Sequence, residues 1–193
     1  MPGPVFLTGD RIDLRTVDEA DVPFLQRWVN HPSIRKYVSL FRTPYSHDEY
    51  VEELYESFDT DSEGASLLIC PHEWDGDGLD EPDDGPTPVG SAQLYPIKDD
   101  QNWANLAYWV APPAQGNGYA TEACELLLAY AFDDLGLHRV MGNALEPNEA
   151  SRHILEELGF VREGAQRECA FVEGEYIDQI LYGLLREEWQ SNT

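Results

Sequence analysis

The sequence contains few basic residues. Its 193 residues include 12 Lys and Arg against 37 Asp and Glu, which gives a formal net charge of −25, and Lys36 and Lys98 are its two lysines. Proteins that bind DNA, RNA or anionic membranes use lysine and arginine to displace the counterions around phosphate groups. Nucleic acids and anionic membrane surfaces are therefore not expected as partners.

The excess of carboxylates over basic residues, about threefold, is typical of proteins that work in concentrated salt. At about 1 M salt the Debye length falls to about 3 Å, so repulsion among surface carboxylates is largely screened. We therefore expect the source to be a halophilic archaeon, and we expect the folding of the chain to depend on salt.

Cysteine is also scarce. Cys70, Cys124 and Cys169 lie far apart and outside any Cys-x-x-Cys spacing, which argues against a disulfide framework and against a zinc site. The five histidines show no metal-ligand spacing. We predict free, mostly buried thiols and no bound metal.

One acidic segment, Asp-Gly-Asp-Gly at residues 75–78, invites a comparison with calcium loops. A loop of the EF-hand type that began at Asp75 would need glycine at its sixth position and glutamate at its twelfth. Asp80 and Pro86 occupy those positions. The comparison fails, and calcium is not predicted.

Long apolar runs are missing. No run approaches the roughly 18 residues of a membrane span, and the N-terminal segment lacks a basic region followed by an apolar stretch. The composition is 42% hydrophobic and 11% aromatic, which is enough for a real core. We expect a cytoplasmic protein with no membrane association and one domain over residues 1–193. Residues 71–88, rich in Pro, Gly and acidic residues, are predicted to be a flexible loop inserted between two adjacent antiparallel strands.

Hydrophobic periodicity predicts an alternation of strands and helices. A capping box at Ser46 and Glu49 marks the start of one helix, and Glu173–Gly174 is suited to a hairpin turn. The predicted strands cover residues 5–16, 65–70, 89–97, 105–110, 139–145, 161–172 and 176–185. The predicted helices cover residues 22–29, a short piece at 34–37, and residues 46–58, 119–135 and 148–158.

The most informative segment is 107–124, in which a predicted strand ends in two prolines and a glycine-rich turn opens a long helix. A helix N-terminus leaves N–H groups unpaired and carries about half a positive charge. Gly116 and Gly118 would let the main chain approach a phosphate closely. The turn is neither a Walker A loop nor GxGxxG, because it lacks GK[ST] and a third glycine. From this segment alone, both an anion-binding site and an ordinary turn are possible interpretations.

The run Gln115-Gly116-Asn117-Gly118-Tyr119-Ala120 resembles the Q/R-x-x-G-x-G/A pyrophosphate loop of the GNAT superfamily of acyl-CoA-dependent N-acetyltransferases. Other segments resemble its RimJ/RimL-like branch in the same order, and together they cover essentially the whole chain except residues 71–88. These segments are DRIDLRTVDEADVPFL, WVNHPSIRKYV, AYWVAPPAQGNGYATEA, EPNEASRHILEELGFVREG and EGEYIDQILYGLL.

The resemblance implies an α/β (α+β) fold with a mixed, mostly antiparallel seven-stranded sheet flanked by helices. The fourth and fifth strands, 105–110 and 139–145, would splay apart and hold the pantetheine arm of acetyl-CoA. Main-chain groups of Trp109 and Val110 would bind the pantetheine. The turn and the start of its helix would bind the cofactor's pyrophosphate, through Gln115, Gly116, Asn117, Gly118, Tyr119, Ala120 and Thr121.

The resemblance further implies that an unprotonated amine attacks the thioester directly, without an acyl-enzyme. Asn148 and Ser151 match the N-x-x-S pattern of the branch. Ser151 would then stabilise or protonate the departing thiolate, and Asn148, with Ser151, would contact the cofactor. Without the resemblance, the residues favour a helix cap at Asn148 and an ordinary first-turn serine at Ser151.

The general base is left open. Two positions where relatives carry an acidic residue hold Asn143 and Asn105, and either asparagine could hold a water that relays a proton. Glu146 is the nearest carboxylate in sequence to the predicted slot. An α-amine with a pKa of about 7.7 to 8.0 is partly neutral at working pH, so a dedicated base is not required.

The sequence predicts the acceptor, and the residues that would contact it, less specifically. Tyr176 and Asp178 match polar positions of the family's G-x-Y-x-D pattern and would be either structural or substrate-lining. Asn105 and Tyr108 are expected to contact the acceptor. The acceptor would be a protein N-terminus, of the ribosomal-protein type, or a small amine such as a polyamine, and the chain would act as a monomer or homodimer. Two alternatives come from other classes: a non-catalytic module that senses acyl-CoA, and an acidic interaction protein that uses residues 71–88.

Overall fold

The computed structural model describes residues 2–38, 43–44, 46–52, 64–79, 85–98 and 101–192. Within these ranges, no helix is both long enough and apolar enough to cross a membrane. Eight strands form one mixed sheet in the order β1-β2-β3-β4-β5-β6-β8-β7. The strands are β1 (Val5–Thr8), β2 (Ile12–Thr16), β3 (Ala65–Pro71), β4 (Gly90–Lys98), β5 (Trp103–Val110), β6 (Arg139–Leu145), β7 (Val161–Val172) and β8 (Glu175–Leu185). The helices include α1 (Val22–Val29), α2 (Pro32–Arg35), α4 (Tyr119–Ala129), α5 (Glu149–Glu157) and α6 (Arg186–Asn192).

The mostly antiparallel sheet flanked by helices confirms the predicted fold class, but the prediction of seven strands is wrong. Residues 5–16 form two antiparallel strands rather than one, with Leu7 opposite Leu14. The Gly9 N–H donates to the Ile12 carbonyl at 2.8 Å and closes the turn between them. Because apolar alternation continues on both sides of this turn, the period of two does not reveal where the chain reverses.

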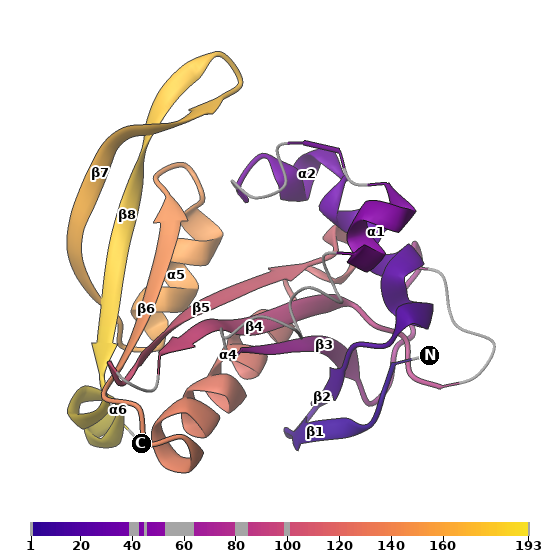
Figure 1. Cartoon of the computed structure of the whole chain (residues 1–193), viewed down its shortest axis with the longest axis horizontal. Helices are drawn as coiled ribbons and strands as arrows, with labels where there is room; N and C mark the ends of the chain where they lie inside the picture. The colour runs from indigo at the N-terminus through magenta and orange to yellow at the C-terminus, as the bar shows by residue number, and fades with distance from the viewer. Residues whose placement is uncertain are drawn as a thin grey trace.

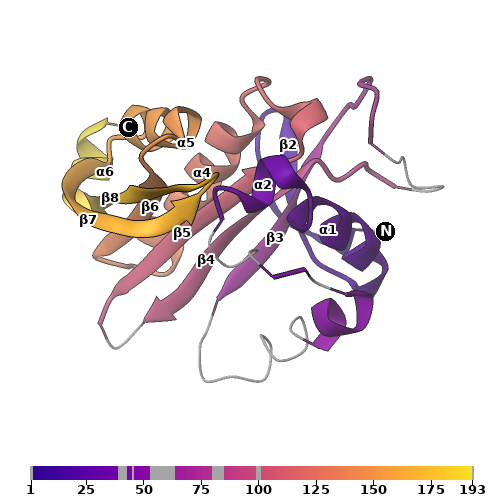
Figure 2. The same ribbon diagram turned by 90° about the horizontal axis from the view of Figure 1, so that it is seen from above.

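Helices cover both faces of the sheet (Figure 1). Trp28 of α1 and Ile34 of α2 are buried on one face with Leu68 and Trp109. Apolar residues of α4 and α5 are buried on the other face, in a cluster that contains Leu127, Leu155 and residues of most strands. Seen from above, α1 and α2 lie over the β3–β4 side and α5 lies beside β6 (Figure 2). Strands β3 and β5 therefore contribute side chains to both of two separate cores.

The loop between β3 and β4 joins two antiparallel neighbours, as predicted. Its residues 80–84 lie outside the described part of the chain. Trp74 and Leu79 are partly buried against the main core, so this acidic loop contributes apolar contacts to the fold near its start.

Three local predictions have clear outcomes. Ser46 and Glu49 form the expected capping box, with the Glu49 N–H donating to Ser46 Oγ at 3.2 Å; residues 47–52 are helical, and the predicted continuation to 58 lies outside the described residues. Glu173 and Gly174 turn between β7 and β8 with φ of 51° and 97°. Cys70 and Cys124 are buried free thiols, whereas Cys169 is exposed.

The sheet changes character between β5 and β6, its parallel pair. Throughout the described strands, their pairing consists of Trp103 with Arg139, Ala104 with Val140 and Asn105 with Met141. Beyond Asn105 and Met141 the two strands diverge (Figure 1). This confirms the predicted splay between the strands at 105–110 and 139–145.

Candidate active site

The glycine-rich turn connects the end of β5 to the start of α4. Gly116 and Gly118 have φ of 80° and 79°, a left-handed conformation that is strained for residues with a Cβ atom. Gly118 is the N-cap of α4 and makes no side-chain cap hydrogen bond. The turn thus needs glycine at both positions for conformational reasons.

Two amide side chains fold back into the same turn. Gln115 Nε2 donates to the Val110 carbonyl at 2.9 Å, and Asn117 Nδ2 donates to the Ala114 carbonyl at 3.0 Å. Both side chains stabilise the turn from within. In the structure described here, Gln115 and Asn117 therefore shape the loop, and the groups that it offers to a ligand are main-chain groups.

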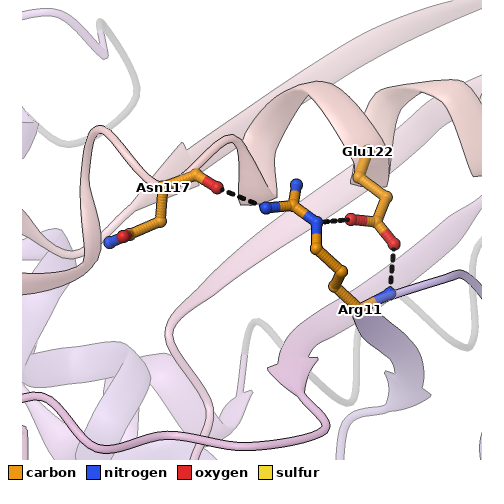
Figure 3. A network of polar contacts seen from close by, with 3 residues as sticks. All are labelled: Arg11, Asn117 and Glu122. Atoms are coloured by element: carbon orange, nitrogen blue, oxygen red, sulfur yellow. Dashed lines mark hydrogen bonds and ion pairs between the residues drawn. The ribbon is translucent and has the colours of Figure 1, made fainter.

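Arg11, in the turn between β1 and β2, holds the loop from outside (Figure 3). Its Nη1 donates to the Asn117 carbonyl at 2.9 Å, and its Nε donates to Glu122 Oε2 at 3.0 Å. The Arg11 main-chain N–H donates to the other oxygen of Glu122 at 2.7 Å. The guanidinium also lies 5.7 Å from the centre of the Tyr119 ring. Sequence reasoning gave Arg11 no role, although the residue is basic in a very acidic chain and lies in the segment DRIDLRTVDEADVPFL that resembles the branch.

The start of α4 fits an anionic group. The first hydrogen bond of the helix runs from the Glu122 N–H to the Gly118 carbonyl at 3.1 Å, so the N–H groups of Tyr119, Ala120 and Thr121 lie outside the helical ladder. A Cβ on Gly116 would meet nothing within 4 Å, which leaves open space on that side of the turn. Main-chain donors at a helix N-terminus match a phosphate, so the residues present fit the pyrophosphate of acetyl-CoA.

Tyr108 and Ser151 come together across the splay. The Tyr108 hydroxyl lies 3.0 Å from Ser151 Oγ and donates to the Ser151 carbonyl at 3.1 Å. Burial raises the pKa of the Tyr108 phenol well above its ordinary value, so the hydroxyl keeps its proton and remains a donor. Tyr108 therefore contacts the first turn of α5 on the side of the sheet that faces the main core.

Asn148 is the N-cap of α5, and its Oδ1 accepts a hydrogen bond from the Ser151 N–H at 3.3 Å. This is the arrangement that the residues favour without any family. The cap uses Oδ1 and leaves the Nδ2 donors of Asn148 available for another role.

Two substitutions of Asn148 separate the cap from that other role. Asn148→Ser keeps a capping oxygen and should change stability little, whereas Asn148→Ala should cost about 1 kcal/mol. If the Nδ2 group also contacts acetyl-CoA, both variants should raise the KM for acetyl-CoA by a similar factor. Thermal unfolding and steady-state kinetics on both variants measure the two effects. A normal KM for acetyl-CoA in Asn148→Ser would mean that Asn148 acts only as the helix cap.

The candidate bases lie at the edge of the splay. Asn143 of β6 is exposed, and its Oδ1 accepts a hydrogen bond from Gln179 of β8. Glu146 is exposed just after β6, and its N–H donates to the Asp178 carbonyl at 2.9 Å. Asn143 is thus partnered by an amide, and the Glu146 side chain faces solvent.

The expected acceptor-side residues do not form one cluster. Tyr176 is 69% exposed near the tip of the β7–β8 hairpin, where it packs on Phe171. Asp178 Oδ1 accepts from the Glu168 N–H at 2.9 Å and stabilises an irregularity in β7. Asn105 lies in the last β5–β6 pair.

Trp109 has a different position from Tyr108. Its side chain is buried on the α1 face and stacks on Phe24 with ring centres 5.8 Å apart. Its side chain therefore serves the core, and the predicted role for Trp109 concerns its main chain.

Comparisons with known proteins agree with this geometry. A family model described as an acetyltransferase (GNAT) domain matches residues 11–161. The "Putative ribosomal N-acetyltransferase YdaF" of Bacillus subtilis is 29% identical over 188 residues, which are 94% of each chain. A structure of spermidine N-acetyltransferase from Vibrio cholerae with CoA and spermine superposes with a TM-score of 0.79 at 27% identity, over 94% of this chain and 99% of that one.

A structure of RimL, the ribosomal L7/L12 alpha-N-protein acetyltransferase, in complex with coenzyme A has a TM-score of 0.78. It covers 94% of this chain and 98% of that one, and at 18% identity it shows the fold alone. The family model spans most of the chain, from the β1–β2 turn to the start of β7. The chain therefore belongs to the GNAT family of N-acetyltransferases, enzymes that use acetyl-CoA.

Proposed function

We propose that this chain transfers the acetyl group of acetyl-CoA to a primary amine by direct attack of the amine on the thioester, as a cytoplasmic RimJ/RimL-type enzyme that acts as a single domain. One observation carries this proposal: the β5–β6 pairing ends at Asn105 and Met141, and β5 then leads into the glycine turn at 115–118. The splay would hold the pantetheine, with main-chain groups of Trp109 and Val110 beside it. The turn would hold the pyrophosphate.

In this proposal Ser151 supplies a hydroxyl to the departing thiolate, and Tyr108 orients that hydroxyl. The 3.0 Å contact between the two hydroxyls supports the pairing. When the Tyr108 proton goes to the Ser151 carbonyl, the Ser151 hydroxyl keeps its own proton for another acceptor. Asn148 would contact the cofactor through Nδ2.

No dedicated base is needed for an acceptor that is an α-amine, because its pKa is about 7.7 to 8.0. Asn143 or Asn105 would hold a water that carries the proton away, and Glu146 is the carboxylate closest to this path along the chain. Tyr176 and Asp178 would line the acceptor side or shape it through the β7–β8 hairpin.

For the acceptor we propose first a protein N-terminus, on the strength of the likeness to the ribosomal N-acetyltransferase over 94% of both chains. A polyamine is the second candidate, favoured by the likeness to the spermidine acetyltransferase. A net charge of −25 attracts either cation, although less strongly in molar salt.

The test is acetyl transfer in about 2 M KCl, where the Debye length is only a few ångströms, to peptides with free N-termini and to polyamines. N-terminally blocked versions of the same peptides are the matched controls. Acetylation of the free peptides alone supports the first candidate, and acetylation of the polyamines alone supports the second. Binding of acetyl-CoA without transfer to any amine would favour the sensing module instead. An acidic interaction protein would be supported if deletion of 71–88 abolished partner binding in a chain without transferase activity.

Removing the Ser151 hydroxyl should lower kcat with little change in KM for acetyl-CoA. We expect Ser151→Ala to reduce kcat by about tenfold, because loss of acid assistance matters less for a thiolate than for a poorer leaving group. Tyr108→Phe should reduce kcat by about threefold through the lost hydrogen bond to Ser151.

Tyr182→Phe is the matched control for these variants. The Tyr182 hydroxyl donates to Glu156 of α5 at 2.8 Å, so Tyr182→Phe also removes a hydrogen bond to the helix that carries Ser151. Steady-state kinetics that showed the same drop for Tyr182→Phe as for Tyr108→Phe would mean that α5 was merely loosened.

A further inference from the structure

We propose that Arg11 is a positioning residue for acetyl-CoA, which sets the conformation and the charge of the pyrophosphate loop without belonging to it. This inference rests on the proposed placement of the pyrophosphate at the start of α4. Arg11 lies in the β1–β2 turn, more than 100 positions earlier in the sequence than the residues that it contacts.

One contact of Arg11 is to the part of the loop that lies between its two glycines. Asn117 stands between Gly116 and Gly118, which both adopt left-handed φ values, and a glycine pair loses more backbone freedom on ordering than other residues do. The Arg11 Nη1 bond to the Asn117 carbonyl, at 2.9 Å, fixes the orientation of that peptide group. A Cβ on Gly118 would lie 3.0 Å from Arg11 Nη2, so the guanidinium also lies directly against the helix start.

The second effect is electrostatic. Glu122 lies in the first turn of α4, and its side chain is only 12% exposed. A carboxylate at this position repels an anion bound to the same helix N-terminus. The Arg11 Nε and main-chain N–H groups occupy both oxygens of Glu122, at 3.0 and 2.7 Å. A charge-assisted pair of this kind cancels most of the negative charge next to the phosphate site.

Both effects concern the pyrophosphate and not the thioester. Loss of Arg11 should therefore weaken the binding of CoA derivatives that carry phosphates and leave the chemical step intact. Acetyl-pantetheine has the same thioester and pantetheine arm but no pyrophosphate, which makes it the informative comparison substrate.

We expect Arg11→Gln to raise the KM for acetyl-CoA by about tenfold, the loss of roughly one charge-assisted hydrogen bond, with kcat within about twofold of wild type. With acetyl-pantetheine, kcat/KM should be unchanged. Arg11→Lys keeps the charge that offsets Glu122 but lacks the planar fork, so it should recover only part of the loss, with a KM for acetyl-CoA about threefold above wild type. The double variant Arg11→Gln/Glu122→Gln should recover part of the loss, because it removes the uncancelled carboxylate.

Arg139→Gln is the matched control, since Arg139 of β6 pairs with Glu163 of β7 across Gly183 of β8. Equal losses with both thioesters, recovery to wild-type KM in Arg11→Lys, or no loss at all would each overturn the proposal. Calorimetric titration of CoA and pantetheine gives a readout that does not need turnover. If the wild-type chain bound CoA but acetylated nothing, the transferase proposal would fail, while selective weakening of CoA binding by Arg11→Gln would still support the role of Arg11.

Discussion

Replacing Gly118 with valine should reduce kcat/KM for acetyl-CoA by about 100-fold. The residue has φ of 79°, and an L residue forced into that region costs roughly 1 to 2 kcal/mol, with more for a β-branched side chain. Its new Cβ would also lie 3.0 Å from Arg11 Nη2. Either the loop moves or the guanidinium leaves Asn117, and both outcomes disturb the donors at the start of α4.

The control for this prediction is Gly174→Val. Gly174 has φ of 97° in the β7–β8 turn, and a Cβ there would meet nothing within 4 Å. Valine at this position would have a comparable left-handed strain, at a site far along the chain from the glycine loop. Kinetics and thermal unfolding on both variants separate strain from site damage. A similar fall in kcat/KM for Gly174→Val, or normal kinetics for Gly118→Val, would contradict the assignment of the loop as the pyrophosphate site.

The second large effect that we expect is a dependence of folding on salt. A net charge of −25 on 193 residues destabilises a compact state through self-repulsion. In about 0.1 M KCl the melting temperature should lie on the order of 15 °C below its value in about 2 M KCl. For a chain of this size, which loses about 2 to 4 °C per kcal/mol, this corresponds to a decrease of roughly 4 to 8 kcal/mol in the free energy of unfolding. Thermal unfolding across KCl concentrations measures this. A melting temperature independent of salt would contradict both the repulsion argument and the proposed halophilic source.

One carboxylate can show whether screening is the cause, because salt also strengthens hydrophobic burial. Burial, followed by the charges of Glu122 and Glu157, raises the pKa of Glu125. A raised pKa means that the ionised form destabilises the fold at neutral pH. Glu125→Gln should therefore stabilise the protein in low salt and stabilise it less in 2 M KCl, where the repulsion from Glu122 and Glu157 is screened and the cost of burial remains. Glu175→Gln, at the start of β8, serves as the comparison. An equal gain from Glu125→Gln at both salt concentrations would exclude screening.

The glycine turn and the splay could be predicted because they rest on local signals and on several segments in a fixed order. The break at Gly9 could not be read from the alternation of Val5–Thr16, since both strands keep the same period. Gly9 and Asp10 were the available turn signal.

Arg11 and Tyr108 show a different limit. The role of Arg11 depends on the fold bringing the β1–β2 turn against the start of α4, and no spacing in the sequence encodes that contact. Tyr108 was expected on the acceptor side, with Asn105 and Tyr176, and that expectation stays a prediction. The contact of its hydroxyl with Ser151 was not predicted. A tyrosine on a strand is an equally good residue for either face, and only the packing of α5 decides between them.

The short β5–β6 pairing also has a mechanical consequence. It joins an antiparallel half, β1 to β5, to a second half made of β6, β8 and β7, and the junction is three residue pairs long. If pantetheine lies between the diverging strands as proposed, it occupies the place of a missing strand, and its amides hydrogen-bond to the strands on either side. Hydrogen bonding would then extend along the diverging parts of β5 and β6 only while the co-substrate is bound, and each release of CoA would leave the two halves joined by the three residue pairs alone. The stiffness of the molecule would rise and fall once in every catalytic cycle.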